Sequence, residues 1–336
     1  MVNQTFFGDK QPPLHIELII KEKKMRKILS ILLVVLLLIP ALSFAEKKAS
    51  YRFVLVPKVV HPWFDLVHEG ARQAAKMLEE WTGSEFKIEY LPPKKAEVAE
   101  QNQILERAIA TRVDGIMIDP LDAEKNRAVL EDVLEKGIQV VVFDSVPPPG
   151  MDLVSIGNDF CEQAQLASHR LAEIIGEEGE VAIMLGVPTA PNHMIRARCH
   201  EETLKLYPKI TIVAKGIDND EIEIAREQAA AIMQAHPNLK GWVACDAAGP
   251  IGIGQAIKEA GKAGKVVYVG SDDLPQMIEL IKEGVADSST STKPRMQGYW
   301  SVLSLWQATL GVNMPKSIDT GIAIITKRMT KDYKGF

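Results

Sequence analysis

The sequence predicts an α/β protein of two lobes, each a parallel sheet covered by helices. Strand and helix patterns alternate strictly along most of the chain, which is typical of parallel sheets. Several strand patterns are continuous apolar runs, such as Ile138–Phe143, and such runs indicate burial on both faces. The alternation breaks at Pro147–Gly150. Because one continuous sheet of this length would be unusual, we expect two lobes.

The segment before the break contains four strand patterns with helix patterns between them. The helix pattern at 96–111 has apolar residues at helical spacing, and Gly137 ends the next helix. The expected strands are Tyr51–Pro57, Phe86–Leu91, Gly115–Ile118 and Ile138–Phe143. The expected helices are Trp63–Trp81, Ala96–Thr111 and Ala123–Lys136.

The segment after the break continues the alternation, with glycine or proline punctuating several elements. The expected strands are Leu153–Ile156, Glu180–Leu185, Ile210–Lys215, Gly241–Ala244, Val266–Gly270 and Val285–Ser289. The expected helices are Phe160–Ile175, Met194–Leu206, Asp220–Ala235, Pro250–Ala260, Pro275–Gly284 and Pro294–Leu310.

The segment Met25–Ala45 predicts a secretory signal peptide. Arg26 and Lys27 form a positive start, Ile28–Leu38 is an apolar run, and small residues precede an expected cleavage after Ala45. The apolar run is shorter than the roughly 20 residues that span a bilayer. We therefore expect a soluble periplasmic or otherwise extracytoplasmic protein.

The N-terminal extension, residues 1–24, precedes the better start at Met25, and we exclude it from the fold together with the signal peptide up to residue 45. The whole chain has 39 Lys and Arg and 44 Asp and Glu, and the first 45 residues hold six and three of these. The remaining chain has 33 basic and 41 acidic side chains, a net charge of −8. This balance argues against nucleic acid and anionic membranes as partners.

The three cysteines, Cys161, Cys199 and Cys245, are scattered and form no CxxC motif. We expect buried free thiols, with one disulfide as the alternative, and no zinc site. His193 and His200 lie seven residues apart without an evident third ligand, so we expect no metal.

Catalytic and cofactor motifs are absent from the sequence, which contains no GxSxG, HExxH or GxxxxGK[ST] pattern. The run Gly249–Gly254 lacks the GxGxxG spacing of dinucleotide sites. We therefore expect no cofactor and no enzyme.

Polar and aromatic side chains gather where the predicted strands end. In parallel sheets, ligands bind beyond these carboxyl ends, so two facing lobes would enclose a cleft. Its carboxylates, guanidinium group and aromatic faces suit a polyhydroxylated neutral ligand. Taken singly, the same residues could be turn caps, core residues or solvated charges. The candidates are Lys58, His61, Trp63, Phe64, Asp144, Asn192, Arg196, Asp246, Asp272 and Thr292.

The sequence resembles the periplasmic sugar-binding proteins of ABC importers, in the type 1 group that includes ribose- and glucose-binding proteins. The resemblance runs from Phe53 to about Thr326. It rests on the segments HPWF, IDPLDAEK, SIGNDF, TAPNHMIRAR, KEAGKAGKVVYVGSDDLPQMIELIKEGV and TKPRMQGY.

The resemblance implies two Rossmann-like lobes with three hinge crossovers, near Ser155–Gly157, Ser291–Thr292 and Thr320. The N-terminal lobe would comprise 51–156 plus 293–320, and the C-terminal lobe 157–292 plus 321–336. A monomer would capture a monosaccharide, close around it and deliver it to the permease subunits of an ABC transporter.

The resemblance also implies roles for the candidates. Trp63 and Phe64 would pack on the sugar ring, and His61 would replace an Asn of the ribose type. The remaining polar contacts would come from Asp144, Asn192, Arg196, Asp246, Asp272 and Thr292.

Several departures leave the ligand open. Ser145 stands where the ribose type has Arg, Asp246 replaces an Asn, and Thr292 replaces a Gln. Lys58 also occurs in autoinducer-2 binders of the group, so a receptor for a non-sugar ligand is an alternative. An exported α/β hydrolase using Asp272 or His61 is another.

Overall fold

A computed structural model of the chain describes residues 23–27 and 48–335. The chain divides into two compact units, Met1–Lys48 and Ala49–Phe336. Within the first unit, residues 23–27 are helical, and the predicted signal peptide with its cleavage point lies largely outside the described residues. No helix in the described ranges has the length and apolar character needed to cross a membrane.

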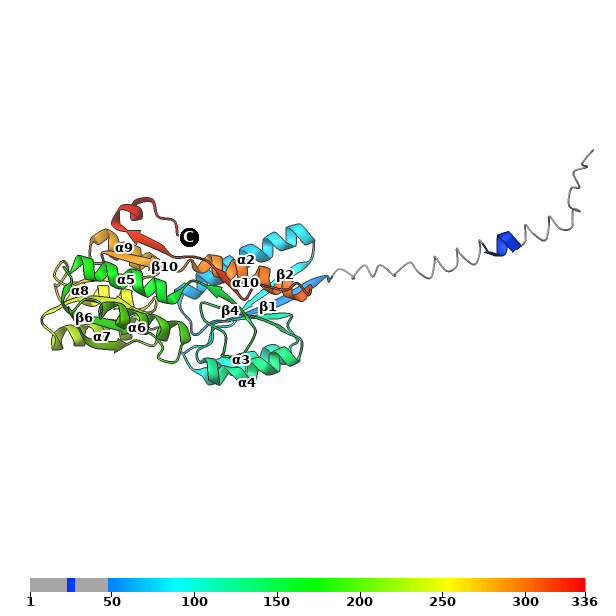
Figure 1. Cartoon of the computed structure of the whole chain (residues 1–336), viewed down its shortest axis with the longest axis horizontal. Helices are drawn as coiled ribbons and strands as arrows, with labels where there is room; N and C mark the ends of the chain where they lie inside the picture. Colours follow the sequence, from blue (N-terminus) through cyan, green and yellow to red (C-terminus); the bar gives the residue numbers. More distant parts are fainter. Residues whose placement is uncertain (1–22, 28–47, 336) are drawn as a thin grey trace, which may run out of the picture. The chain divides into compact units, whose positions relative to one another are not determined.

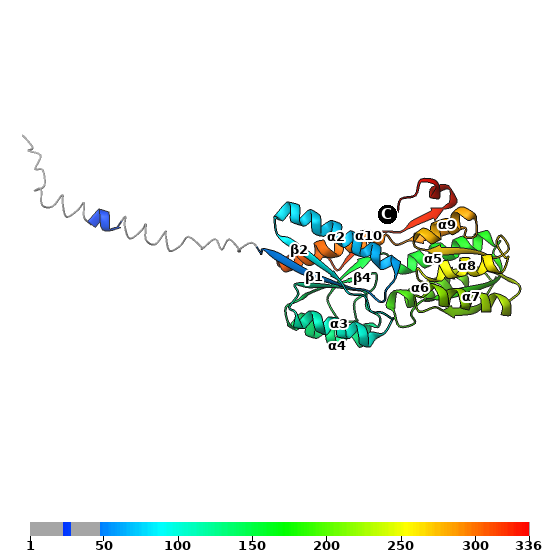
Figure 2. The same ribbon diagram turned by 180° about the vertical axis from the view of Figure 1, so that it is seen from behind.

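The second unit contains two α/β lobes, as predicted (Figure 1). The first sheet is entirely parallel and has the order β11-β5-β4-β3-β1-β2. Helices α2 and α10 cover one face, and α3 and α4 cover the other (Figure 2). The strands are β1 (Ser50–Val56), β2 (Glu85–Tyr90), β3 (Gly115–Ile118), β4 (Gln139–Phe143), β5 (Val154–Gly157) and β11 (Ser317–Asp319). The helices are α2 (Pro62–Thr82), α3 (Val98–Ala110), α4 (Ala123–Glu135) and α10 (Pro294–Thr309).

The second sheet has the order β12-β10-β9-β8-β6-β7, and only β12 runs antiparallel to its neighbour. Helices α5 and α6 pack together, as do α7 and α8. The strands are β6 (Glu178–Leu185), β7 (Lys209–Ile217), β8 (Leu239–Ala244), β9 (Val267–Ser271), β10 (Ser288–Ser291) and β12 (Ala323–Thr326). The helices are α5 (Phe160–Ile174), α6 (Pro191–Leu204), α7 (Ile222–Ala235), α8 (Gly249–Glu259), α9 (Pro275–Glu283) and the 3₁₀ helix η1 (Lys327–Asp332).

The chain passes between the two sheets three times: after β5, between β10 and α10, and between β11 and β12. The three passages are hydrogen-bonded to one another. The backbone N–H of Thr320 donates to the carbonyl of Gly157 at 2.6 Å, and its hydroxyl lies 3.4 Å from the carbonyl of Thr292. The crossovers therefore form one joint between the lobes.

Helices α2 and α10 pack with their backbones in close contact. A Cβ atom at Gly298 would lie 1.8 Å from the carbonyl oxygen of Val67, and one at Gly70 would lie 1.9 Å from that of Arg295. Only glycine permits such an approach. This contact fixes α10 against the first sheet directly after the second crossover.

Two expectations from the sequence were wrong. The strand expected at Val285–Ser289 begins at Ser288, because Gly284 ends α9 in the left-handed conformation and the chain first turns back toward the sheet. The expected free thiols of Cys161 and Cys199 form a disulfide between α5 and α6, with their Cα atoms 5.3 Å apart. Cys245 is free and buried. Strands β11 and β12 lie in a segment for which the sequence predicted only a crossover.

The disulfide predicts a stability loss when it is removed. It joins cysteines 38 residues apart, and a cross-link of this span constrains the unfolded chain by about 3–4 kcal/mol. We expect the Cys161→Ser/Cys199→Ser variant to lose about this much free energy of unfolding in urea denaturation. The oxidised protein should weaken similarly when a reductant is added, whereas the variant should not respond. Equal stability of the oxidised and reduced proteins would contradict this expectation.

The contact between α2 and α10 predicts a cost for Gly298→Ala. The added methyl group would meet the backbone of Val67 rather than a flexible side chain, so we expect a loss of about 1–3 kcal/mol. Urea denaturation measures it. Gln307→Ala, on the same helix and only partly buried, is the matched control and should change stability little. A stabilised Gly298→Ala variant would show that the helices can separate at no cost.

Candidate functional site

A cavity with an empty volume of about 250 Å³ lies at the carboxyl ends of strands from both sheets. The cavity is lined by Lys58, His61, Trp63, Phe64, Asp144, His193, Arg196, Asp220, Asp246, Ala247 and Asp272. Eight of the ten residues singled out in the sequence are in this set.

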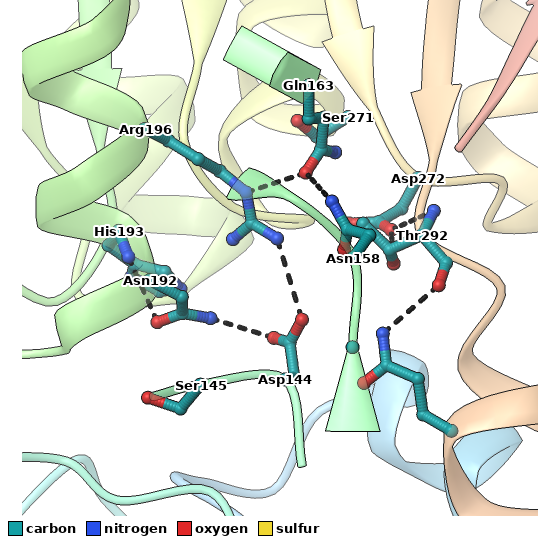
Figure 3. A network of polar contacts seen from close by, with 12 residues as sticks. Asp144, Ser145, Asn158, Gln163, Asn192, His193, Arg196, Ser271, Asp272 and Thr292 are labelled. Carbon is teal, nitrogen blue, oxygen red and sulfur yellow. Dashed lines mark hydrogen bonds and ion pairs between the residues drawn. The ribbon is translucent and has the colours of Figure 1, made fainter. Parts of the chain in front are cut away.

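Asp144 joins the two lobes across the cavity. It follows β4 in the left-handed conformation, with φ 46°, and so turns its carboxylate toward the second lobe. Asn192 Nδ2 donates to Oδ2 of Asp144 at 2.8 Å, and Arg196 Nη2 lies 3.5 Å from its Oδ1 (Figure 3). Asn192 thus lies behind Asp144 rather than on the cavity wall.

Lys58 supplies a buried cation to the first lobe's side of the cavity. Its side chain is 1% exposed and forms an ion pair with Asp119, which is fully buried. The ammonium group is also 3.7 Å from Asp144 Oδ2. Burial alone would lower the pKa of Lys58, but Asp119 and Asp144 outweigh it and keep the pKa above its usual value. Asp119 was not among the predicted site residues.

Arg196 is held in place by its own lobe. Its Nε donates to Gln163 Oε1 at 2.8 Å (Figure 3), and Nη1 donates to the carbonyl of Cys245 at 3.2 Å. The guanidinium lies 4.8 Å from the centre of the Phe160 ring. With these donors engaged, the group facing Asp144 has a fixed orientation.

The aromatic wall is tied to the opposite lobe. Trp63 Nε1 donates to the hydroxyl oxygen of Thr292 at 3.2 Å, and that hydroxyl donates to Asp272. Trp63 and Phe64 pack edge to face, with ring centres 5.1 Å apart. Thr292 therefore positions Trp63 and Asp272 from behind. Burial raises the pKa of Asp272 to about 7, although Arg196 and Thr292 act in the opposite direction.

Two histidines contribute N–H donors. Trp63 N donates to His61 Nδ1 at 3.2 Å, and Val187 N donates to His193 Nδ1 at 2.9 Å. A ring nitrogen that accepts carries no proton, so each imidazole is neutral with its proton on Nε2. Burial lowers the pKa of both histidines. His61 Nε2 has no hydrogen-bond partner within the described ranges.

Three carboxyl groups of the second lobe lie together: Asp218 and Asp220, after β7, and Asp246, after β8. Asp246 accepts from the backbone N–H groups of Ala248 and Gly249, each at 3.2 Å. Burial and Asp220 raise the pKa of Asp218 to about 8, and burial together with Asp218 and Asp220 raises that of Asp246.

The prediction from sequence missed Asp220 and His193 as cavity residues. Asp220 was assigned to the start of a helix, and His193 was considered only as a metal ligand. Asp220 follows the end of β7, so the rule that located Asp246 could have found it. Within the described ranges, no group of three His, Cys, Asp or Glu residues is arranged to hold a metal ion.

Comparisons with known proteins agree with this architecture. Residues 52–311 match the family described as a periplasmic binding protein domain. A D-ribose/D-allose-binding protein of Pseudomonas aeruginosa is 28% identical, over 71% of this chain and 76% of the relative. The solved structure of an ABC transporter solute-binding protein from Burkholderia graminis, in complex with D-arabinose, is 27% identical with a TM-score of 0.80. It covers 86% of this chain and 99% of that one. GanP, a glucose-galactose binding protein from Geobacillus stearothermophilus, is 29% identical with a TM-score of 0.77, covering 84% and 99%.

The raised pKa of Asp218 predicts how stability depends on pH. With a pKa of about 8 in the folded state and about 3.9 in the unfolded chain, Asp218 binds more protons when the protein is folded. Between pH 4 and 8 the free energy of unfolding should therefore fall as pH rises, by up to about 1.4 kcal/mol per pH unit for this group. Asp218→Asn cannot titrate, so its urea denaturation at pH 5, 6, 7 and 8 should show a flatter slope. Identical slopes in the two proteins would contradict the assignment.

Proposed function

The chain belongs to the periplasmic binding protein family, and we propose that it captures a monosaccharide in the cavity between its lobes. The observation that carries this proposal is the chemistry of the cavity wall, where aromatic faces lie beside buried hydrogen-bond donors and acceptors. The related proteins from Pseudomonas aeruginosa, Burkholderia graminis and Geobacillus stearothermophilus, whose names or structures include sugars, support the same ligand class.

The proposed contacts follow from the donors and acceptors on the wall. Asp144, Asp246 and Asp272 accept from sugar hydroxyls, because a carboxylate can accept from two of them. The donors are the ammonium of Lys58, the guanidinium of Arg196 and the His61 Nε2–H group.

The apolar face of the sugar packs on Trp63 and Phe64, while Asn192 and Thr292 hold Asp144 and Asp272 in place. Ligand contacts from both lobes would make capture and closure one event.

We propose that the lobes comprise 51–156 plus 293–320 and 157–292 plus 321–336, and that they close as rigid bodies about the three crossovers. Contacts between the lobes in this structure support this, because an opened arrangement would break them. Besides those of Asp144, the Thr189 hydroxyl donates to the carbonyl of Leu121 at 2.9 Å. A ligand that contacts both lobes shifts the population toward the closed form.

The proposed partner is the permease of an ABC transporter, which would receive the sugar from the closed monomer outside the cytoplasm. Members of this family bind solutes rather than transform them, so the sugar would leave unchanged. Export would depend on the predicted signal peptide, most of which lies outside the described residues.

Asp144→Asn tests the proposed site. The amide keeps the shape of the carboxylate but removes its charge, so we expect sugar affinity to fall about 10- to 100-fold. Calorimetry with ribose, allose, arabinose, xylose, glucose and galactose would first identify the sugar. At 100 times its dissociation constant, that sugar should stabilise the unmutated protein by about 2.7 kcal/mol.

Asp152→Asn is the control for this test, because it removes the same charge from a side chain that is 85% exposed. It should bind as the unmutated protein does. Failure of every sugar to bind would contradict the proposal and favour a receptor for another ligand, such as autoinducer-2. Conversion of the bound sugar into a product would favour an exported hydrolase.

A further inference from the structure

The cavity wall carries more carboxyl groups than permanently cationic groups. Its two permanent cations are Lys58 and Arg196, and both lie against Asp144. Lys58 is also paired with Asp119 behind the wall. The wall has three further carboxyl groups, those of Asp220, Asp246 and Asp272. The carboxyl groups without a paired cation therefore lie mainly on the second lobe.

The histidines do not balance this excess. His61 and His193 both accept a backbone N–H at Nδ1, so each is neutral and offers only an N–H dipole. The full positive charge that acts on Asp220 is that of Lys58, which lowers the pKa of Asp220 but is already paired with Asp119 and close to Asp144.

The carboxyl groups of Asp218, Asp220 and Asp246 are also crowded. A Cβ atom at Gly249 would lie 2.7 Å from Asp246 Oδ1 and 3.0 Å from Asp218 Oδ2, so both oxygens converge on the start of α8. Asp218 Oδ2 has no donor in the described part of the chain. Two facing carboxylates cannot donate to each other, so this end of the cavity needs added protons or a cation.

A second observation indicates that a ligand meets these groups. His61 is 4% exposed and lines the same cavity, and its Nε2–H group has no acceptor among the described residues. A buried donor left unpaired is costly. A ligand that satisfies the wall must therefore bring an oxygen acceptor for His61 and positively charged donors for the carboxylates.

We propose that the ligand is a monosaccharide that carries a protonated amine, with its ammonium group against Asp220 and Asp246 and one of its oxygens accepting from His61. This inference rests on the proposed function and narrows the ligand to an amino sugar. Hydrogen bonds from a cation to a buried carboxylate are roughly twice as strong as neutral ones, so the amine should improve affinity about tenfold or more over a hydroxyl at the same carbon.

The protonation of the cavity wall leads to a second consequence. The raised pKa values of Asp218 and Asp246 mean that these groups hold protons until a cation arrives. The charged group beside them is Asp220, and Asp220 in turn faces Lys58 and the two neutral histidines. Binding of an ammonium ion should therefore release protons, whereas binding of a neutral sugar should not.

The test is calorimetry of the purified protein with matched ligand pairs. The probes are the 2-amino, 3-amino and 6-amino derivatives of D-glucose and D-galactose, each compared with its parent hexose. We expect at least one amine to bind about tenfold or more tightly than its parent, and titrations in buffers of different ionisation enthalpy to show proton release for that amine only.

Asp220→Asn is the matched variant. Asp220 has φ 66°, a conformation that asparagine also adopts, so the backbone should be preserved. We expect the affinity ratio of amine to parent to fall to about one in this variant and to stay unchanged in Asp152→Asn.

Tighter binding of the parent sugars would overturn the amine assignment and leave the proposed function standing. Failure of all six amino sugars and their two parent hexoses, and of the neutral sugars tested above, would overturn both. If the affinity ratio of amine to parent is the same in Asp220→Asn as in the unmutated protein, the amine does not bind at Asp220, and the proposed position of the ammonium group is wrong.

Discussion

The buried carboxylate of Asp144 is the group on which the contact between the two lobes depends. It extends from the first lobe, yet Asn192 and Arg196 of the second lobe donate to it. A charge taken out of water is costly unless partners surround it. The lobes cannot separate without exposing Asp144 to water and giving up both donors, so this group couples the geometry of the cavity to the relative position of the sheets.

The second lobe is built to hold Arg196 in register for this contact. Phe160 and Gln163 on α5 contact the guanidinium, and the disulfide joins Cys161 of α5 to Cys199 of α6. Both cysteines lie within three positions of the residues that form this contact. The disulfide therefore joins the two helices whose separation sets the position of Arg196. The same covalent link contributes both to the stability of the protein and to the orientation of Arg196.

Local sequence patterns predicted the repeated strands and helices, because apolar spacing and glycine positions report directly on them. The strand-end rule predicted Asp144 at the end of a strand of the first lobe, and Asp246 and Asp272 at strand ends of the second. Other features depend on contacts between distant segments. The pairing of Cys161 with Cys199 requires the packing of α5 on α6, and β12 requires the antiparallel edge of β10. No local pattern carries that information, and Asp220 was missed because its segment also reads as a helix start.

The arrangement also explains why closure requires a matching ligand. In this structure, His61 Nε2 and Asp218 Oδ2 are buried without partners among the described residues, and each such group costs about 1–3 kcal/mol. Contacts between the lobes, such as those of Asp144, offset part of this cost. Of these two groups only His61 lines the cavity, so under the proposed function a ligand that accepts from its Nε2–H group would remove that part of the cost. On the proposed function, His61 would therefore contribute to selectivity, while the paired groups hold the side chains of the cavity in position.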